Sequence, residues 1–301
     1  MRRPLPPSLT QMPIRTSLAL ALTTLLAAAA PARGEETLIP SSAVSDPSAL
    51  GVASPEATRS RRAPTSTPAT AEPVPFAPGE QIDVVIDYLH VRTGQARLMV
   101  GKPEGAVWPV ICQARTEGVA GLLDIREHYV TYWDAERHLS RGSDLNAIEV
   151  GDRHTDRARF DRENGKAIVQ VVRKGRAQES THDVPPDVQD LASALLALRM
   201  KPLQAGDRYE LPVFSGRDVF TLRAEVEGDE AVETPAGRFD TTRVKVQLGF
   251  KDRFHTRRDA HVWLSRDARH IPVRMSADFA VGSVAVTLSG YRPGGPLAAS
   301  R

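Results

Sequence analysis

Cysteine is almost absent from this sequence, because Cys112 is the only one among 301 residues. A single thiol cannot form a disulfide within its own chain, so the folded part must rely on a packed core. Aromatic residues are also scarce, at 5%. A transmembrane barrel needs aromatic girdles and a lipid-facing apolar band. Their absence argues against an outer-membrane barrel and favours a water-soluble barrel whose apolar side points inward.

Sequence signatures of catalysis are missing as well. The chain has no Gly-x-Ser-x-Gly elbow, no phosphate-binding loop and no Cys–His pairing typical of a nucleophile. Its eight histidines include no helical His-x-x-x-His pair. Asp83 and Asp87 face the same side of a predicted strand, but alternate acids are common on a solvent-facing side. We therefore expect no enzyme, no metal site and no cofactor.

Acidic residues are absent from the first 34 positions, which carry four arginines. An apolar run begins at Ser17, and the small residues of Pro31-Ala-Arg-Gly34 follow it. This order of segments predicts a secretory signal peptide over residues 1–34, cleaved after Ala32 or Gly34. The apolar run is shorter than the ~20 residues of a membrane anchor. We expect a bacterial protein that is periplasmic or secreted and does not span the membrane after processing.

The charge of the chain changes when this segment is removed. Without its four arginines the chain keeps 35 Lys and Arg against 37 Asp and Glu, a net charge of about −2. The charge balance therefore gives no support to a nucleic-acid or anionic-membrane partner.

The remaining chain divides by composition into three parts. Residues 35–75 are rich in Pro, Ser, Ala and Thr, and a segment of this kind buries too little apolar surface to offset its ordering entropy. They are predicted to form a disordered linker. Residues 76–291 are predicted to form a β-rich domain, and residues 292–301 a disordered tail.

Alternation with a period of two dominates the predicted domain. Between Ile82 and Tyr88, apolar residues alternate with Asp83 and Asp87, which predicts a half-buried strand. A turn is expected at Thr93-Gly94. Similar runs predict a meander of antiparallel hairpins. They cover residues 96–100, 107–116, 125–133, 139–150, 154–161, 167–174, 177–183, 209–214, 218–227, 243–248, 260–264, 270–275 and 281–288.

One amphipathic helix is predicted, over about 186–200. Prolines stand at its start, and Pro202 and Gly206 follow its end. Helical spacing places Leu195 near the middle of a wide apolar arc and Leu196 at its edge, with Gln189, Asp190 and Ser193 facing away. The fold predicted is all-β with one helix. We expect a large antiparallel barrel or a strongly curved half-barrel sheet, plugged or covered by this helix.

Five residues are candidates for contact with a ligand inside such a sheet: Leu195, Leu196, Arg199, Trp133 and Trp263. Arg199 falls within the apolar arc, and two interpretations are open. Its long side chain extends outward to water and the last helical carbonyls, or it is buried and binds an anionic ligand. For the tryptophans, packing in the core is the alternative to contact with a ligand.

Five short motifs together resemble a known family. They are Pro78-Gly-Glu80, Gly94-Gln-Ala-Arg-Leu98, Asp190-Leu-Ala-Ser-Ala-Leu-Leu-Ala-Leu-Arg199, Glu233-Thr-Pro-Ala-Gly-Arg-Phe239, and Trp263-Leu-Ser-Arg-Asp267 with Ile271-Pro-Val-Arg274. In order and spacing they resemble the domain of unknown function 3108 family of exported bacterial proteins, over about 76–291. The resemblance implies no activity and no catalytic residue. Its curved sheet with a helix is similar to periplasmic lipoprotein and lipid carriers, at the level of fold alone.

These observations predict an exported β-rich protein that binds an apolar ligand, such as a lipid, or a protein partner of the cell envelope. The alternative is a structural or assembly factor of the envelope, with a filled core and no small-molecule ligand. The identity of a ligand or partner and the oligomeric state do not follow from the sequence.

Overall fold

Strands make up almost all of the regular structure in the computed structural model, which describes residues 74–250, 253–254, 260–279 and 282–295. The predicted signal peptide (1–34) and nearly all of the predicted linker (35–75) lie outside these residues. The strands are β1 Gln81–Tyr88, β2 Val91–Val100, β3 Val107–Thr116, β4 Arg126–Asp134, β5 Leu139–Glu149, β6 Asp152–Asp161, β7 Lys166–Arg173, β8 Arg176–Asp183, β9 Arg208–Phe214, β10 Val219–Thr234, β11 Gly237–Phe250, β12 Arg253–Phe254, β13 Ala260–Ser265, β14 Pro272–Phe279 and β15 Gly282–Arg292.

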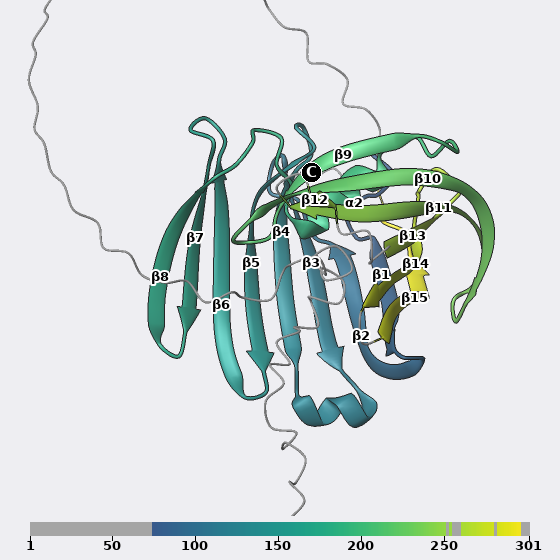
Figure 1. Ribbon diagram of the computed structural model, residues 1–301, viewed down its shortest axis with the longest axis horizontal. Helices are drawn as coiled ribbons and strands as arrows, with labels where there is room; N and C mark the ends of the chain where they lie inside the picture. Colours follow the sequence, from purple (N-terminus) through teal and green to yellow (C-terminus); the bar gives the residue numbers. More distant parts are fainter. Residues whose placement is uncertain (1–73, 251–252, 255–259, 280–281, 296–301) are drawn as a thin grey trace, which may run out of the picture. The chain divides into compact units, whose positions relative to one another are not determined.

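These strands form one antiparallel sheet in the order β8-β7-β6-β5-β4-β3-β2-β1-β15-β14-β13-β11-β10-β9, with β12 paired to β11 (Figure 1). Nearly all neighbours in the sheet are also neighbours in the chain, as in a meander of hairpins. The exceptions are the pair β1–β15, which joins the first strand to the last, and the pair β11–β13, which skips the two-residue β12. The β1–β15 pair therefore joins the two halves of the sheet, β1 to β8 and β9 to β15.

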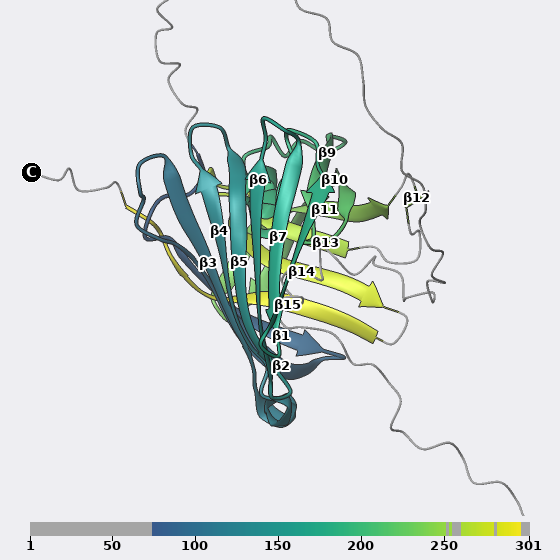
Figure 2. The same ribbon diagram turned by 90° about the vertical axis from the view of Figure 1, so that its left-hand side faces the viewer.

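The sheet is curled but open. Its outermost strands are β8 and β9, and the described residues form no ladder between them. Figure 2 shows β3 to β7 standing side by side, with β11, β13, β14 and β15 running across behind them. This confirms the predicted all-β fold with one α-helix, in its open, strongly curved form. A short 3-10 helix, η1 (Gly118–Leu123), also connects β3 to β4.

The first hairpin turns at Leu89-His90, and the turn predicted at Thr93-Gly94 is wrong. Leu89 and His90 have positive φ angles of 50° and 65°, the backbone of a two-residue type I′ turn. Gly94 instead lies within β2, opposite Ile86 and Thr116. Leu-His is not a turn-forming pair, whereas Thr-Gly is, so the residue types pointed to the wrong position.

The α-helix, α2, spans Leu191–Arg199 and is shorter than the predicted 186–200. Asp190 is its N-cap: the carboxylate accepts a hydrogen bond from the Ser193 amide at 2.9 Å, and the Ser193 hydroxyl accepts one from the Asp190 amide at 2.9 Å. This reciprocal pair is a capping box with serine in the place of the usual glutamate.

The residues before the cap are held by β9, which explains the shorter helix. The Gln189 amide donates to the Pro212 carbonyl at 2.8 Å, and the Gln189 carbonyl accepts from the Phe214 amide at 2.8 Å. Strand-like backbone bonds of this kind are incompatible with helical continuation through Gln189. Tertiary pairing therefore overrides the helix-starting signal of the two prolines.

The main core surrounds α2. Eight of the nine helical residues are buried, and Leu195 and Leu196 pack with apolar residues of β1 to β4 and of strands in the second half of the sheet. The predicted polar side of the helix is wrong, because Gln189, Asp190 and Ser193 are only 3%, 2% and 0% exposed. A curled sheet encloses the helix from more than one side, so a single apolar arc does not describe its environment.

Candidate functional site

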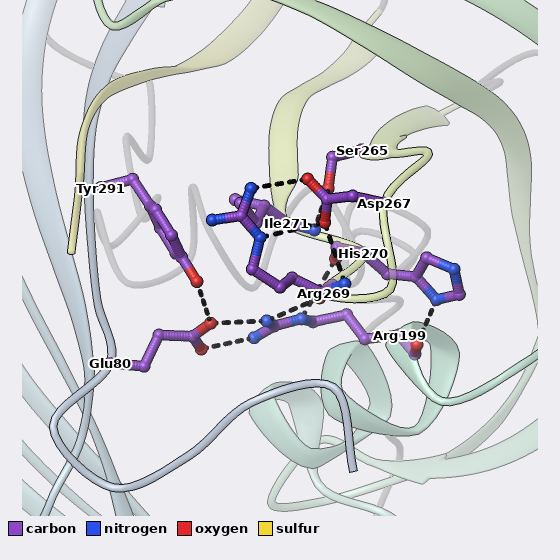
Figure 3. Close-up of polar contacts among 8 residues, drawn as sticks. All are labelled: Glu80, Arg199, Ser265, Asp267, Arg269, His270, Ile271 and Tyr291. Atoms are coloured by element: carbon purple, nitrogen blue, oxygen red, sulfur yellow. Dashed lines mark hydrogen bonds and ion pairs between the residues drawn. The ribbon is translucent and has the colours of Figure 1, made fainter. Parts of the chain in front are cut away.

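The most deeply buried charges of the described chain form an ion pair between Arg199 and Glu80. Their side chains are 0% and 1% exposed. Arg199 Nη1 donates to Glu80 Oε2 at 2.8 Å, and Nη2 donates to Oε1 at 2.8 Å. Figure 3 shows this two-pronged contact between the end of α2 and the residue just before β1. Parallel bonds of this type are the strongest arrangement between guanidinium and carboxylate.

Two further donors of Arg199 also have partners. Nε donates to the carbonyl of His270 at 3.1 Å, and Nη2 donates to the carbonyl of Arg269 at 3.0 Å. The guanidinium carbon lies 5.0 Å from the centre of the Phe76 ring. Four donated bonds therefore hold the guanidinium inside the protein.

These contacts correct the expectation that Arg199 extends outward to water. They also do not match the alternative, a buried arginine that binds an anionic ligand, because the carboxylate of Glu80 already occupies the guanidinium. The sequence does carry a signal for the pair: Arg199 stands in an apolar helical arc, and Glu80 directly precedes an apolar strand. Each charge needs a partner there, but 119 residues separate the two.

The network continues outward from Glu80 to the last strand. Tyr291, in β15, donates from its hydroxyl to Glu80 Oε1 at 3.1 Å. Burial, and then the negative charge of Glu80, raise the pKa of Tyr291 to about 12. The Arg269 guanidinium lies 5.1 Å from the centre of the Tyr291 ring. Tyr291 thus stays protonated and remains a hydrogen-bond donor at any physiological pH.

The turn between β13 and β14 closes the network on its other side. His270 Nδ1 donates to the carbonyl of Arg199 at 2.6 Å, which satisfies a carbonyl at the end of α2. Asp267 pairs with Arg269 at 2.7 Å, and the Ser265 hydroxyl accepts from the Ile271 amide at 2.8 Å. Figure 3 shows these groups beside the Glu80–Arg199 pair. Three of the five family-like motifs supply residues to the clusters at the two ends of α2.

A second buried carboxylate holds the other end of α2. Asp190 accepts hydrogen bonds from Thr131 of β4 at 3.0 Å and from Ser140 of β5 at 2.5 Å, besides that from the Ser193 amide. Burial raises the pKa of Asp190, although these donors oppose the increase. Because Asp190 contacts β4 and β5 while Arg199 contacts Glu80 beside β1, α2 lies across the strands near one end of the sheet.

Beyond α2, the inner face of the sheet carries small residues and a few polar groups. Five side chains stand directly opposite one another across β2 to β6, in a row that lies four residues along β4 from Thr131. All are buried, at 2–5% exposed. The row, called here the inner row, consists of Ala96, Ala114, Glu127, Ala147 and His154.

Two weakly acidic side chains beside the inner row, the Cys112 thiol and the Tyr129 phenol, keep their protons. Burial, and then the charge of Glu127, raise the pKa of Cys112 to about 12. Burial, and then the charge of Asp190, raise the pKa of Tyr129 well above its usual value. The thiol and the phenol are therefore neutral, and neither is an activated nucleophile.

The five predicted ligand-facing residues do not form one surface. Leu195, Leu196 and Trp133 lie in the main core, and Leu196 and Trp133 are fully buried at 0% exposed. The expected edge position of Leu196 is therefore wrong. Trp263 belongs to a separate small cluster with Val232 and Val273 and donates to Glu230 at 2.9 Å. It lies on the face of β13 opposite to that of its neighbours Val262 and Leu264, which are in the main core.

Two open clefts adjoin the β13–β14 turn. The larger has a volume of about 540 Å³ and reaches His270, Arg266 and the segment from Pro202 to Ala205. The second, of about 400 Å³, shares Arg266. In the larger cleft, Arg266 pairs with Asp229 at 3.1 Å, so its charge is already balanced.

Among the described residues, no group of three or more His, Cys, Asp and Glu side chains is placed to hold a metal ion. No helix in the described part of the chain has the length and apolar character needed to cross a membrane.

Comparison with known proteins identifies a family. The sequence model described as "Protein of unknown function (DUF3108)" matches residues 83–289. No curated protein matches the chain. Among solved structures, a β-barrel-like protein of the domain of unknown function DUF1849 from Brucella abortus is 13% identical, with a TM-score of 0.52 over 73% of this chain and 99% of that one. This likeness supports the fold alone.

A second solved structure is the lipoprotein LppX from Mycobacterium tuberculosis. It is 14% identical and covers 73% of this chain and 89% of its own, with a TM-score of 0.23. A superposition this poor carries no information about a ligand.

Proposed function

Because the chain belongs to the DUF3108 family of proteins of unknown function, we propose a function from its own interior: it is an exported, non-enzymatic protein that binds an apolar ligand between the curled sheet and α2. The observation that carries the proposal is the position of α2. The helix crosses the strands near one end of the sheet, between the Asp190 contacts on β4 and β5 and the Arg199 contact beside β1.

The size of the helix supports this proposal. Because α2 lies across the strands, it covers only its width of about 10–12 Å along them, whereas β2 to β6, with nine to eleven residues each, are about 30 Å or longer. The inner row lies four residues from Thr131 along β4, or about 13 Å beyond the level of the helix cap. A part of the inner face therefore extends past the helix.

Residue size on that part of the sheet supports the same proposal. Three of the five residues of the inner row are alanines, and Ala147 belongs to none of the three apolar core clusters although it is 2% exposed. On the opposite half of the sheet, Ala260 and Ala277 stand opposite each other in the main core. We infer that small side chains at these positions let the interior take up an apolar molecule.

The inner row also supplies the few polar groups that a ligand site uses to orient its ligand. Glu127 and His154 flank Ala147 on neighbouring strands. We infer a ligand with an apolar body and one polar group, which is the composition of a lipid. Export rests on the sequence of residues 1–34, and N-terminal sequencing of the mature protein should find a start directly after Ala32 or Gly34.

The proposal is tested by filling the interior. Ala147→Phe places a large ring in the inner row, and Ala167→Phe is the matched control, because Ala167 is fully buried within a packed cluster of β6, β7 and β9. If the inner row faces a ligand, Ala147→Phe keeps the thermal midpoint of the protein but abolishes binding of a fluorescent apolar probe. Ala167→Phe destabilises the protein by about 1–3 kcal/mol through overpacking.

The alternative is an envelope assembly factor with a filled core. In that case Ala147→Phe destabilises the protein as much as Ala167→Phe does, and the wild-type protein binds no apolar probe. Mass spectrometry of extracts from the protein purified after export provides a second readout. Absence of any co-purifying lipid, together with absence of probe binding, would contradict a ligand-binding interior.

A further inference from the structure

Four connections between strands lie along one end of the β1–β8 half of the sheet. They are the β1–β2 turn, η1, the β5–β6 turn and the β7–β8 turn, which all point to the lower edge in Figure 1. We call this set the turn row. Six strand spacings separate its outermost turns, which corresponds to a length of about 30 Å.

The turn row carries the most exposed large hydrophobic side chains of the described chain. Leu89 in the β1–β2 turn and Val91 directly after it are 53% and 59% exposed, and Val150 in the β5–β6 turn is 67% exposed. The other large hydrophobic residues with high exposure, Ile168 and Val172 in β7, reach only 38% and 40%. Single exposed apolar residues are ordinary, but three of them on the turns of one edge form a pattern.

The backbone of these turns makes their residue types more unusual. Leu89 and Val150 have φ angles of 50° and 49°, in the left-handed region where Gly, Asn and Asp are favoured and where a β-branched residue is strained. Val150 therefore destabilises the folded state in two ways, through strain in its backbone and through exposure of its apolar side chain to water. An unfavourable residue at such a position indicates a role outside the fold.

Charge on the turn row is locally positive, although the net charge of the chain without its first 34 residues is about −2. Asp87 pairs with Arg92, and Asp124 pairs with Arg126. Near the β5–β6 and β7–β8 turns, four exposed basic residues outnumber the three nearby acids, Glu149, Asp152 and Asp156. The basic residues are Arg153, Arg173, Lys174 and Arg176.

We propose that the turn row is a docking surface for an anionic lipid bilayer. Aliphatic tips at the ends of rigid hairpins can enter the headgroup region while basic side chains beside them contact lipid phosphates. Net charge does not predict this partner, because attraction to a surface acts over about a Debye length and depends on the local charges that face it. Docking of this kind goes beyond the proposed function, since it needs no ligand in the interior.

The test measures co-sedimentation of the processed protein with vesicles of phosphatidylglycerol and phosphatidylcholine in equal parts, and with vesicles of phosphatidylcholine alone. We expect binding to the anionic vesicles at low salt and its loss near 0.5 M NaCl, where charges are screened within about 4 Å. Val150→Asn should weaken binding about fivefold by removing an inserted aliphatic side chain. Replacing Arg173, Lys174 and Arg176 by Gln should weaken it by at least about fivefold for each charge in contact with the surface.

Val150→Asn has a second readout that separates docking from folding. Asparagine accepts the left-handed backbone better than valine, so the thermal midpoint of Val150→Asn should rise while its vesicle binding falls. Ile168→Asn is the matched control, because it removes an exposed aliphatic residue from the face of β7 and away from the turns. Equal weakening by Ile168→Asn, or a folded wild-type protein that does not bind anionic vesicles, would overturn the proposal. Loss of apolar-probe binding with vesicle binding intact would concern the interior ligand site alone.

Discussion

A fully buried arginine persists in a fold only where its charge is compensated, and Glu80 compensates Arg199 from 119 residues away. Removing one partner of such a pair leaves the other charge buried without compensation, which typically costs about 3–5 kcal/mol. Replacing both partners by apolar residues of similar volume is far less destabilising. The Glu80–Arg199 pair is therefore expected to behave as one unit under mutation.

We predict that Arg199→Met and Glu80→Leu each lower the free energy of unfolding by about 3–5 kcal/mol, and that the double variant loses clearly less than either single variant. Urea denaturation followed by tryptophan fluorescence measures all three. Glu225→Gln, which breaks the exposed pair of Glu225 with Arg208, is the control and should change stability little. Additive losses in the double variant would show that the two charges are independent.

At the scale of residues, the sequence predicts which residues are unusual in their apolar pattern better than it predicts which distant residues pair with them. Arg199 was identified as an unusual charge in an apolar arc, but its partner was not, because pairing between residues this far apart is decided by the curl of the sheet. The sequence places Leu196 at the edge of the apolar arc for the same reason. A helical projection treats the helix as lying on one surface, whereas α2 has sheet or loop on nearly every side.

At the scale of elements, the N-terminus of α2 depends on a carboxylate in an apolar surrounding. Burial raises the pKa of Asp190, so the folded protein holds a proton there more tightly than the unfolded chain does. Protonation then favours the folded state. The contribution of Asp190 to the free energy of unfolding therefore decreases as pH rises from the unfolded value, about 3.9, through the higher folded value.

We predict that Asp190→Asn becomes more stable relative to the wild type as pH rises through this window. The amide oxygen of asparagine can still accept from the Ser193 amide, so the cap is retained. Urea denaturation at a series of pH values between about 4 and 7 measures the difference. Asp183→Asn is the control with the opposite sign, measured below about pH 3.9, because the hydrogen bond from Lys166 lowers the pKa of the exposed Asp183 and moves its window below the unfolded value. Parallel pH profiles for Asp190→Asn and the wild type would contradict the prediction.

Strands were predicted better than turns because the alternation of apolar residues is a local signal. The predicted run 107–116 coincides with β3, and the run 177–183 lies within β8. The β1–β2 turn was misplaced because Leu89 and His90 have no turn-forming chemistry. If the turn row docks on a lipid surface, this error has a physical origin: the turn residues serve an interaction outside the fold and not the geometry of the turn.

At the scale of the whole molecule, the first and last strands in the chain, β1 and β15, pair with each other inside the sheet, and the residues next to them mark the limits of the domain. β15 continues to Arg292, one residue past the predicted end of the domain, and the Gly295 amide donates to the Pro78 carbonyl at 3.1 Å. At the other limit, Val74 packs against the main core. Composition alone places such boundaries only where polar sequence begins, so it misses short apolar segments that complete a core.

Phe76 makes the position of the first boundary testable. It is 5% exposed, its ring centre lies 5.0 Å from that of Trp133, and the Arg199 guanidinium lies over its face. We predict that a chain starting at Glu72 keeps the thermal midpoint of the processed protein within about 2 °C. A chain starting at Ala77 should lose about 10 °C, since deletion of a buried Phe costs about 3–5 kcal/mol and each kcal/mol shifts the midpoint by about 2–4 °C.

Phe76→Ala in the chain that starts at Glu72 separates the side chain from the new terminus, and it should reproduce most of the loss. Differential scanning calorimetry measures all three chains under one condition. A large drop for the chain starting at Glu72 would mean that the segment before it stabilises the domain. Equal midpoints for the chains starting at Glu72 and Ala77 would mean that the core is complete without Phe76, and that Arg199 needs only Glu80 and the carbonyls of the β13–β14 turn to remain buried.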